Sequence, residues 1–275
     1  MNDIIKLKKN KFEFEFQFSI CTIVNDMNEY LIMKQSFEEN GFTKDCEYII
    51  ADNTVENEFD AYESISHFLK VANGLYVLVV HQDIRVKDNV EKLKSCLLEL
   101  TNKDAAWAVC GNAGSRGYHE SILHISYDSH KDLTDELPIK VNSLDENFLI
   151  IRKSSNMTVS PNLKGFHLYG TDLCIIAHFL GYNCYVIEFM VQHLSKGNIG
   201  SLKIYENVFV MQYGDKMKLG YIQTTCTQFY LSNSKKLNKF LNMPPIFFIV
   251  KQFQRYPYLL KSFKKKTAVK TYVKN

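Results

Sequence analysis

The sequence predicts an α/β fold in which helices pack against a mainly parallel sheet. Strand-like and helix-like segments alternate over residues 18–110, an order typical of parallel strands joined by helical crossovers. The segment 75–80 contains no charged residue and is rich in valine, as expected for a strand buried on both faces of such a sheet. Successive strand-like segments end in polar residues, and in open α/β sheets ligands bind beyond the carboxyl ends of the strands.

The first half of the chain supplies most of the predicted elements. Strict alternation over 12–18 predicts a half-buried strand at the flank of the sheet, and the apolar segment 19–24 predicts a second strand. Apolar residues at helical spacing, with stops such as Gly41 and Gly74, predict three helices. The predicted elements of this half are strands at 12–18, 19–24, 46–51, 75–80 and 106–110, and helices at 28–40, 60–72 and 88–100.

The second half of the chain is less regular. Thr171 is predicted to be the N-cap of a helix, and Gly181 is predicted to end that helix. The other expectations are an irregular loop over 111–140 with a short strand at 122–125, a buried strand from Phe148, a strand over 182–191, and a helical and irregular region over 201–240.

Length and composition favour one large α/β domain, residues 1–243, followed by a basic extension, residues 244–275. The hydrophobic content of 46% indicates a globular protein, and the net charge of +3 is too small to indicate nucleic-acid binding. Seven scattered cysteines without a Cys-x-x-Cys pair favour a reducing cytoplasm over a disulfide framework or a zinc cluster. We expect no signal peptide, because residues 1–11 are polar and basic and contain no apolar h-region. We expect no spanning helix, because no run approaches about 20 apolar residues.

Three successive predicted strands end in an acidic residue, namely Asp26, Asp52 and Asp83. In a parallel sheet these ends meet at one edge, where three acids indicate a site for a nucleotide, a metal ion or both. The alternative is that each carboxylate caps the loop or helix that follows it. Both interpretations remain open at this point.

The segments SICTIVND, CEYIIADNT and NGLYVLVVHQDI, in this order, resemble the nucleotide-sugar-binding half of family 2 glycosyltransferases with the GT-A fold. The resemblance covers roughly residues 18–200 and rests on short motifs. It implies a GT-A-like (Rossmann-type) mixed, mainly parallel sheet flanked by helices. It also implies that Asn25 and Asp26 touch the nucleotide and that Asp52 and Asn53 bind its base or ribose.

In this family an Asp-x-Asp motif after the third strand holds a divalent cation, and here His81-Gln82-Asp83 takes its place. The resemblance implies Asp83 as the chief metal ligand, with His81 beside it and His193 completing the metal or diphosphate site. The cation, Mn²⁺ or Mg²⁺, would stabilise the charge that grows on the nucleoside diphosphate as it leaves. A neutral histidine ligates Mn²⁺ but is a poor Mg²⁺ ligand, and His81 has the alternative role of donating a hydrogen bond to a phosphate.

The resemblance assigns further residues to the donor. Asp145 and Glu146 lie in an acidic turn that corresponds to the segment beneath the donor sugar, although a solvated acidic turn is the alternative, above all for Glu146. Lys196 is close enough in sequence to His193 to pair with a phosphate. The segment GNAGSRG lacks the lysine and the spacing of a P-loop, so we interpret it as a loop near the acceptor, with Arg116 as a candidate anion contact.

The segment GFHLYGTDLC resembles the family motif whose aspartate is the catalytic base, which implies this role for Asp172. An inverting transferase needs one carboxylate to accept the proton of the acceptor hydroxyl while its oxygen attacks the anomeric carbon. The residue before it is Thr171, where many members carry an acid. The alternative is that Asp172 is a capping carboxylate in the first turn of a helix.

From Lys251 onwards the chain holds eight Lys and Arg residues, no acidic residue and several interleaved aromatic residues. Such a segment binds an anionic membrane or nucleic acid, or forms a solvated helix that packs by its aromatic side. The resemblance to a transferase favours the membrane, because surface glycans are often built on lipid carriers at the inner leaflet. We therefore expect a nucleotide-sugar donor, a glycan or lipid-linked acceptor, an anionic membrane surface reached from the cytoplasm, and no nucleic-acid partner.

The predicted function is thus the transfer of a sugar from a nucleotide-sugar to such an acceptor, with inversion. The main alternative is a non-catalytic relative in which His81 and Thr171 mark a degraded site. Nucleotidyltransferases also use strand-end acids and a metal ion. They usually carry a glycine-rich, basic loop after the first strand, which the segment VNDMNEY lacks.

Overall fold

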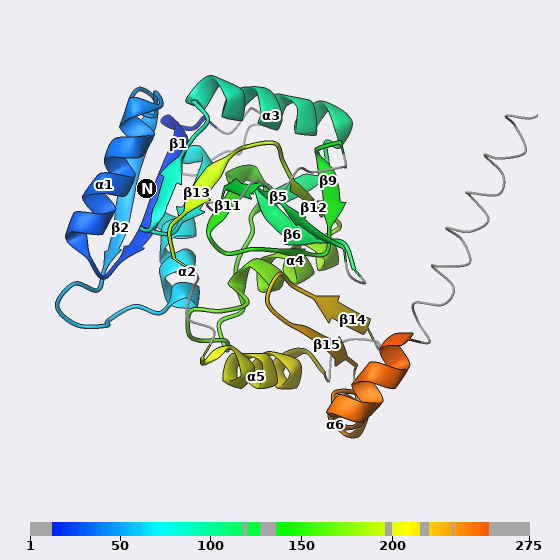
Figure 1. Cartoon of the computed structure of the whole chain (residues 1–275). Coiled ribbons are helices and arrows are strands. Elements are labelled where there is room, and N and C mark those ends of the chain that lie inside the picture. The colour runs from blue at the N-terminus through cyan, green and yellow to red at the C-terminus, as the bar shows by residue number, and fades with distance from the viewer. Residues whose placement is uncertain are drawn as a thin grey trace, which may run out of the picture.

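The computed structural model describes residues 13–117, 120–126, 136–195, 200–214, 220–232 and 234–252. Their core is a seven-stranded sheet with the strand order β2-β1-β3-β11-β5-β12-β9 (Figure 1). In chain order these strands are β1 (Phe16–Val24), β2 (Cys46–Asp52), β3 (Gly74–Val80), β5 (Trp107–Gly111), β9 (Ile139–Val141), β11 (Phe148–Arg152) and β12 (Asn183–Val186).

Most of these strands are parallel. β1 is parallel to β2 and β3, and β12 is parallel to β5. β11 runs antiparallel between β3 and β5, and β9 runs antiparallel beside β12. The predicted α/β class, with a mixed, mainly parallel sheet, is therefore confirmed, and the carboxyl ends of β1, β2 and β3 lie at one edge of the sheet.

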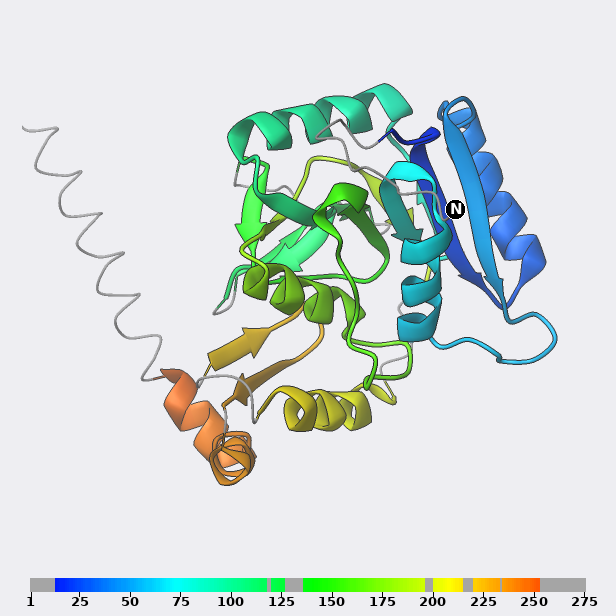
Figure 2. The ribbon, with the colours of Figure 1, turned by 180° about the vertical axis from the view of Figure 1, so that it is seen from behind.

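Helices cover both faces of the sheet, as Figures 1 and 2 show from opposite sides. Residues of α1 and α3 share one apolar core with the sheet, and residues of α2 and α4 share the other. The described helices are α1 (Met27–Glu39), α2 (Ala61–Val71), α3 (Val90–Lys103), the 3₁₀ turn η1 (Lys153–Ser155), α4 (Tyr169–Phe179), α5 (Leu202–Gly214) and α6 (Lys235–Leu241), with a further helical segment over 244–252.

Strand β3 is buried on both faces, as its uncharged sequence predicts. Val77 and Val79 belong to the core that includes α2 and α4, whereas Leu78 and Val80 belong to the core that includes α1 and α3. Successive side chains of a strand point to opposite faces, so each face of β3 needs apolar side chains. This packing fixes the end of β3, and with it the position of the residues that follow.

Side chains cap the helices that follow β1 and β2, and they also cap α3. Asp26, Asp60 and Asn89 accept hydrogen bonds from backbone N–H groups in the first turns of α1, α2 and α3 respectively. These caps satisfy amide groups that have no partner within the helix. The capping interpretation therefore holds for Asp26, and its contact with a nucleotide stays a prediction.

Short strands form smaller sheets beside the main one, with the orders β10-β6-β7 and β4-β13-β8 and the hairpin β14-β15. The pairing of β4 with β13 brings the chain that follows β3 next to the chain that follows β12. These strands are β4 (Ile84–Val86), β6 (Ala113–Ser115), β7 (Ser121–Leu123), β8 (Ile125–Ser126), β10 (Ser143–Leu144), β13 (Val191–His193), β14 (Gly220–Gln223) and β15 (Gln228–Leu231).

Two predictions of strand boundaries are wrong. The segments 12–18 and 19–24 form one strand as far as they are described, because the ladders from β1 to β2 and β3 run without a break from Phe18 onwards. The predicted strand over 182–191 is two strands, since the chain leaves the main sheet after Val186 and then pairs with β4.

The predictions for the irregular regions are incomplete. The segment 111–140 contains several short strands in its described residues, because β6 pairs with both β7 and β10. The region 201–240 contains the hairpin β14–β15 between its two helices. Strands as short as these contain too few residues for an alternating pattern to be recognised in the sequence.

The start of α4 also differs from its prediction. The N-cap is Leu168, which has a φ of 67° and makes no side-chain capping bond, so Thr171 lies within the helix. Asp172 lies in the first turn, as predicted. After α6, the helical segment 244–252 begins at two prolines, which the first turn of a helix tolerates. Within the described ranges, no helix is both long enough and apolar enough to cross a membrane.

Candidate functional site

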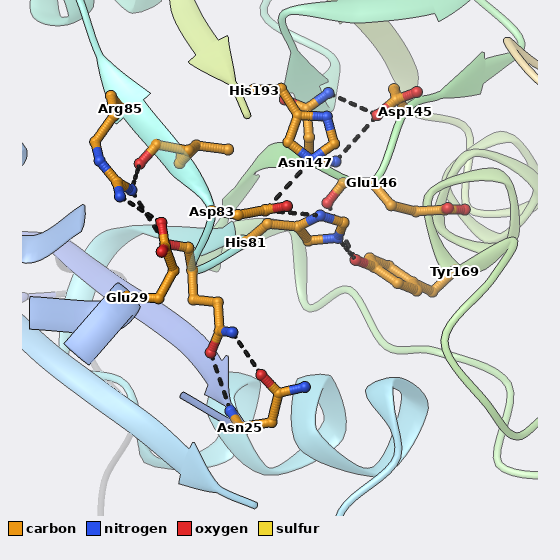
Figure 3. A network of polar contacts seen from close by, with 12 residues as sticks. Asn25, Glu29, His81, Asp83, Arg85, Asp145, Glu146, Asn147, Tyr169 and His193 are labelled. Atoms are coloured by element: carbon orange, nitrogen blue, oxygen red, sulfur yellow. Dashed lines mark hydrogen bonds and ion pairs between the residues drawn. The ribbon is translucent and has the colours of Figure 1, made fainter. Parts of the chain in front are cut away.

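Three predicted metal ligands meet beyond the carboxyl end of β3. Asp83 Oδ1 lies 3.8 Å from His81 Nδ1 and 3.3 Å from His193 Nε2, and the ligand atoms of all three residues lie within 4.8 Å of one another. His193 is opposite Ile84 in the β13–β4 ladder, and Leu194 N–H donates to Asp83 O over 3.0 Å. Figure 3 shows the three side chains converging. We call this cluster the His–Asp–His triad.

The protonation states of Asp83 and His81 suit a metal ion. Burial opposes the charge of Asp83, but hydrogen bonds from His193 and Ser195 and the neighbouring His81 outweigh burial and hold the pKa of Asp83 well below its usual range. Burial lowers the pKa of His81, and this effect exceeds the opposing attraction of the Asp83 charge. A carboxylate and a neutral imidazole are the forms that bind metal ions.

Tyr169 determines which nitrogen of His81 carries the proton. The Tyr169 hydroxyl donates to the carbonyl oxygen of Glu146 over 3.0 Å and lies 2.8 Å from His81 Nε2. Because its single hydrogen is used by Glu146, the hydroxyl accepts from His81, so Nε2 carries the proton. Nδ1, which faces Asp83, then has a free lone pair. An outer partner that fixes a histidine tautomer in this way is typical of metal sites.

The donor set of the triad fits a divalent transition metal. One carboxylate and two imidazoles form a mixed oxygen and nitrogen set that suits Mn²⁺ and its neighbours in the first row, whereas Mg²⁺ prefers oxygen ligands. The chain thus keeps the last acid of the predicted Asp-x-Asp position and replaces the first with His81.

Gln82, between the two triad residues, ties the ends of β1 and β3 together. Its Oε1 accepts from the backbone N–H groups of Asn25 and Asp26 over 3.0 and 3.2 Å, and its Nε2 donates to Asn25 Oδ1. Asn25 therefore lies at the same edge as the triad, as predicted. This role of Gln82 cannot be predicted from the sequence, because the contact spans 57 residues.

The end of β2 supplies one exposed and one buried side chain. Asp52 is exposed, and the hydroxyl and backbone N–H of Thr54 donate to its Oδ1 and lower its pKa. Asn53 is buried and bonds Asn57 and both backbone polar groups of Phe59. Asn53 thus shapes the loop before α2, while Asp52 stays open to solvent. Their predicted contacts with a base or ribose stay predictions.

The acidic turn after β10 lies beside the triad (Figure 3). Asp145 accepts from the backbone and side-chain amides of Asn147 at Oδ1 and from Thr225 at Oδ2. The Oδ1 of Asn147 is buried and has no hydrogen-bond partner among the described residues, so it is an acceptor that a ligand or water would satisfy. Burial, followed by the charge of Asp145, raises the pKa of Glu146 to about 8.

Asp172 is fully buried and engaged at both oxygens. Ser160 donates to it from its backbone N–H over 2.7 Å and from its hydroxyl over 2.6 Å, and the Tyr213 hydroxyl also donates. Burial raises the pKa of Asp172 in spite of these bonds. Its bonds join α4 to α5 and to the segment before α4, and within the described residues none of its hydrogen bonds reaches the triad. The role of Asp172 as a base stays a prediction.

Two further predicted anion contacts have different outcomes. Arg116 forms an ion pair with Glu120 in the described part of its loop. Lys196 lies outside the described residues, and its contact with a phosphate stays a prediction. Besides Gln82, the residues that sequence analysis missed are Tyr169, Asn147 and Thr225, whose contacts with the site depend on the fold rather than on a motif.

Comparison with known proteins gives one clear relative. The chain is 36% identical over 197 residues to "ATP synthase subunits region ORF 6" from Fuscovulum blasticum, which covers 68% of this chain and 79% of that protein. The chain belongs to the family of that protein. The relative's name states no activity, so it does not decide between the possible functions. No family model matches the chain.

Solved structures similar to the chain include two that hold nucleotide-sugars. TarS from S. aureus, in complex with UDP-GlcNAc, is 12% identical, with a TM-score of 0.47, over 71% of this chain and 65% of that one. The mannosyltransferase PcManGT from Pyrobaculum calidifontis, in complex with GDP-Man and Mn²⁺, is 10% identical, with a TM-score of 0.46, over 74% and 67%. These partial similarities, at TM-scores below 0.5, concern the arrangement of the chain alone.

Proposed function

We propose that this protein is a glycosyltransferase that moves a sugar from a nucleotide-sugar donor to a glycan or lipid-linked acceptor with the help of a divalent cation. The observation that carries the proposal is the His–Asp–His triad. Its ligand atoms lie within 4.8 Å of one another beyond the end of β3, at the edge of the sheet where ligands of α/β proteins bind.

The cation would be held by Asp83 Oδ1, His81 Nδ1 and His193 Nε2. When bound, it would neutralise the charge that develops on the leaving diphosphate. Tyr169 keeps the Nδ1 lone pair of His81 available, and Gln82 holds the end of β1 against the end of β3. The exposed Asp52 carboxylate would then meet the nucleoside, as the resemblance to family 2 enzymes implies.

The proton of the acceptor hydroxyl needs a carboxylate. Asp172 is the base that the sequence resemblance implies, and to act it must give up its bonds to Ser160 and Tyr213. Glu146 is a second candidate, because it is half-buried beside the triad and its raised pKa of about 8 is near the range suited to proton transfer at neutral pH. Inversion at the anomeric carbon, with one such base, is part of the proposal.

A screen of nucleotide-sugars tests the proposal. Thermal stability and sugar release are measured with UDP-, GDP-, CMP- and dTDP-sugars, with and without Mn²⁺, for the wild type and Asp83→Ala. We expect one donor to stabilise the wild type only with metal, by about 2.7 kcal/mol at 100 times its Kd, and Asp83→Ala to lose that stabilisation. The matched control is Asp45→Asn, at the opposite end of β2, where φ is 57° and asparagine is tolerated.

The outcomes separate the alternatives. Metal-dependent stabilisation without sugar release or transfer would favour the non-catalytic nucleotide-sugar-binding relative. Formation of a nucleotide-sugar from a nucleoside triphosphate and a sugar phosphate would favour a nucleotidyltransferase. An absence of any metal-dependent response to every donor, or an Asp83→Ala variant that responds like the wild type, would overturn the proposal. We also propose that the protein acts at the cytoplasmic face of a membrane, where a lipid-linked acceptor would lie.

A further inference from the structure

The charges of this chain are segregated along the sequence. The last 60 residues, 216–275, hold 13 of the 33 Lys and Arg residues and none of the 30 Asp and Glu residues. The first 215 residues therefore carry 20 basic and 30 acidic residues. A net charge of +3 conceals this separation, and such asymmetry between two parts of a chain suggests binding to nucleic acid or to a membrane.

The described part of the basic region has a defined place in the fold. Asn242, just after α6, bonds the backbone N–H and C=O of Tyr230 over 2.7 and 2.8 Å. In the helical segment 244–252, the Phe247 ring packs on Tyr230 and Tyr221, with centroid distances of 5.5 and 6.2 Å. The two helices are thus fixed on the β14–β15 hairpin, at a corner of the molecule away from β1, β2 and β3 (Figures 1 and 2).

Both helices carry exposed large apolar residues, and α6 also carries exposed lysines. Asn238 and Leu241 form the buried side of α6. The exposed large apolar residues, between 36% and 63% accessible, are Leu237, Phe240, Met243, Phe248 and Ile249, and the exposed lysines of α6 are Lys235, Lys236 and Lys239. We call these eight residues the basic apolar face. The five apolar residues all fall within 237–249, and exposed apolar patches mark interaction surfaces.

We propose that the basic apolar face docks on an anionic lipid surface. Lipid headgroups supply the negative charge that the lysines would meet, and the acyl boundary just beneath takes up aromatic and aliphatic side chains from a helix lying in the interface. Binding to nucleic acid would use the lysines but would leave Phe248 and Ile249 exposed. The apolar and basic residues together therefore favour lipid.

The face is connected through the hairpin to the acidic turn beside the triad. Thr225, in the turn between β14 and β15, donates to Asp145 Oδ2 over 2.7 Å, and Phe247 packs on the same hairpin at Tyr230. Docking would therefore hold the membrane next to the element that supports the acidic turn of the site. The proposal does not depend on the glycosyltransferase assignment, because lipid binding is measured without a sugar or a metal ion.

Sedimentation of the full-length protein with vesicles tests the face. Vesicles of phosphatidylglycerol and phosphatidylcholine are compared with vesicles of phosphatidylcholine alone. One variant combines Phe240→Ser, Phe248→Ser and Ile249→Ser, and a second combines Lys235→Glu, Lys236→Glu and Lys239→Glu. The matched controls are Leu31→Ser with Ile32→Ser on α1, where the residues are 53% and 50% exposed, and Lys44→Glu with Lys70→Glu and Lys87→Glu, which are exposed lysines elsewhere.

We expect the wild type and both controls to bind anionic vesicles and to be released by salt, because the Debye length shrinks to about 3 Å at 1 M ionic strength. Each face variant should lose at least about tenfold in partitioning, as several lysine and aromatic contacts are removed. Circular dichroism checks that every variant is folded. As an independent measurement, the tryptophan fluorescence of a Phe248→Trp variant should be quenched by brominated acyl chains in anionic vesicles.

Three results would overturn the proposal. The first is a wild-type protein that does not bind anionic vesicles. The second is a folded face variant that binds as well as its control, or a Phe248→Trp variant whose fluorescence brominated lipid does not quench. The third is binding of single-stranded RNA at physiological salt that the lysine variant abolishes while vesicle binding is unchanged, which would assign the lysines to nucleic acid.

Discussion

Replacing Tyr169 with phenylalanine tests the most specific feature of the triad. The change removes one hydroxyl and keeps the ring. His81 Nε2–H then loses its acceptor at 2.8 Å, and the Glu146 carbonyl loses its donor at 3.0 Å. His81 is free to move its proton to Nδ1, the nitrogen that faces Asp83. Metal binding would then have to reverse this tautomer before Nδ1 ligates the cation.

The expected magnitude follows from the role of such outer partners. Loss of a hydrogen bond that orients a metal-bound histidine typically reduces metal affinity by about 10–100-fold, which corresponds to about 1.4–2.7 kcal/mol. Isothermal titration calorimetry with MnCl₂ measures this loss directly, without a substrate. We expect Asp83→Ala to abolish binding and Tyr169→Phe to weaken it within the stated range.

Tyr62→Phe is the matched control. Tyr62 donates to a backbone carbonyl, that of His167, over 3.0 Å, and its ring packs on Tyr169 with a centroid distance of 6.3 Å. The Tyr62→Phe variant therefore loses a similar hydrogen bond in the same region. Within the described residues, no hydrogen bond joins Tyr62 to His81. Equal Mn²⁺ affinity in Tyr169→Phe and wild type, or an equal loss in Tyr62→Phe, would refute the tautomer argument.

Three further predictions address the remaining site residues. Asp172→Asn should destabilise the fold by about 1–3 kcal/mol, because Ser160 and Tyr213 lose a charged acceptor. Urea unfolding measures this loss of stability, and unchanged stability would show that the buried bonds contribute little. If Asp172 is also the base, turnover should fall about 10²–10⁴-fold. In the folded protein the pKa of Glu146 is about 8, whereas the usual value is 4.5. The folded protein therefore binds this proton more tightly than the unfolded chain does, and the stability of the wild type should fall as the pH rises from 4.5 through 8. Thermal melts of Glu146→Gln should lack that decline, and parallel pH profiles would contradict the raised pKa. His81→Asp should improve Mg²⁺ binding relative to Mn²⁺ in calorimetric titrations, since it replaces nitrogen with oxygen; an unchanged preference would remove His81 from the ligand set.

The sequence predicts those parts of the site that follow directly from strand ends. β3 is uncharged from Gly74 to Val80 and is buried on both faces, so periodicity and composition locate His81 and Asp83 correctly. The parallel order of β1, β2 and β3 then places their ends together. His193 is joined to them because β13 pairs with β4, and the family resemblance anticipates its place although no local pattern does.

The parts that sequence analysis misses depend on contacts between distant segments. Tyr169 meets His81 across 88 residues, and Thr225 meets Asp145 across 80. The burial of Asp172 is of the same kind, because its partners Ser160 and Tyr213 approach it from outside α4. A polar residue in the first turn of a helix has the same local pattern whether it faces solvent or the core, so periodicity cannot distinguish the two.

The substitution of histidine in the Asp-x-Asp position changes the electrical balance of the site. With Asp83 as its single anionic ligand and with uncharged imidazoles, a triad that holds a divalent ion has a net charge of +1, whereas two carboxylates would leave it neutral. The remaining positive charge would attract a diphosphate over longer distances, and this attraction decays within about 10 Å at 0.1 M salt. Such a protein would capture its donor best at low ionic strength.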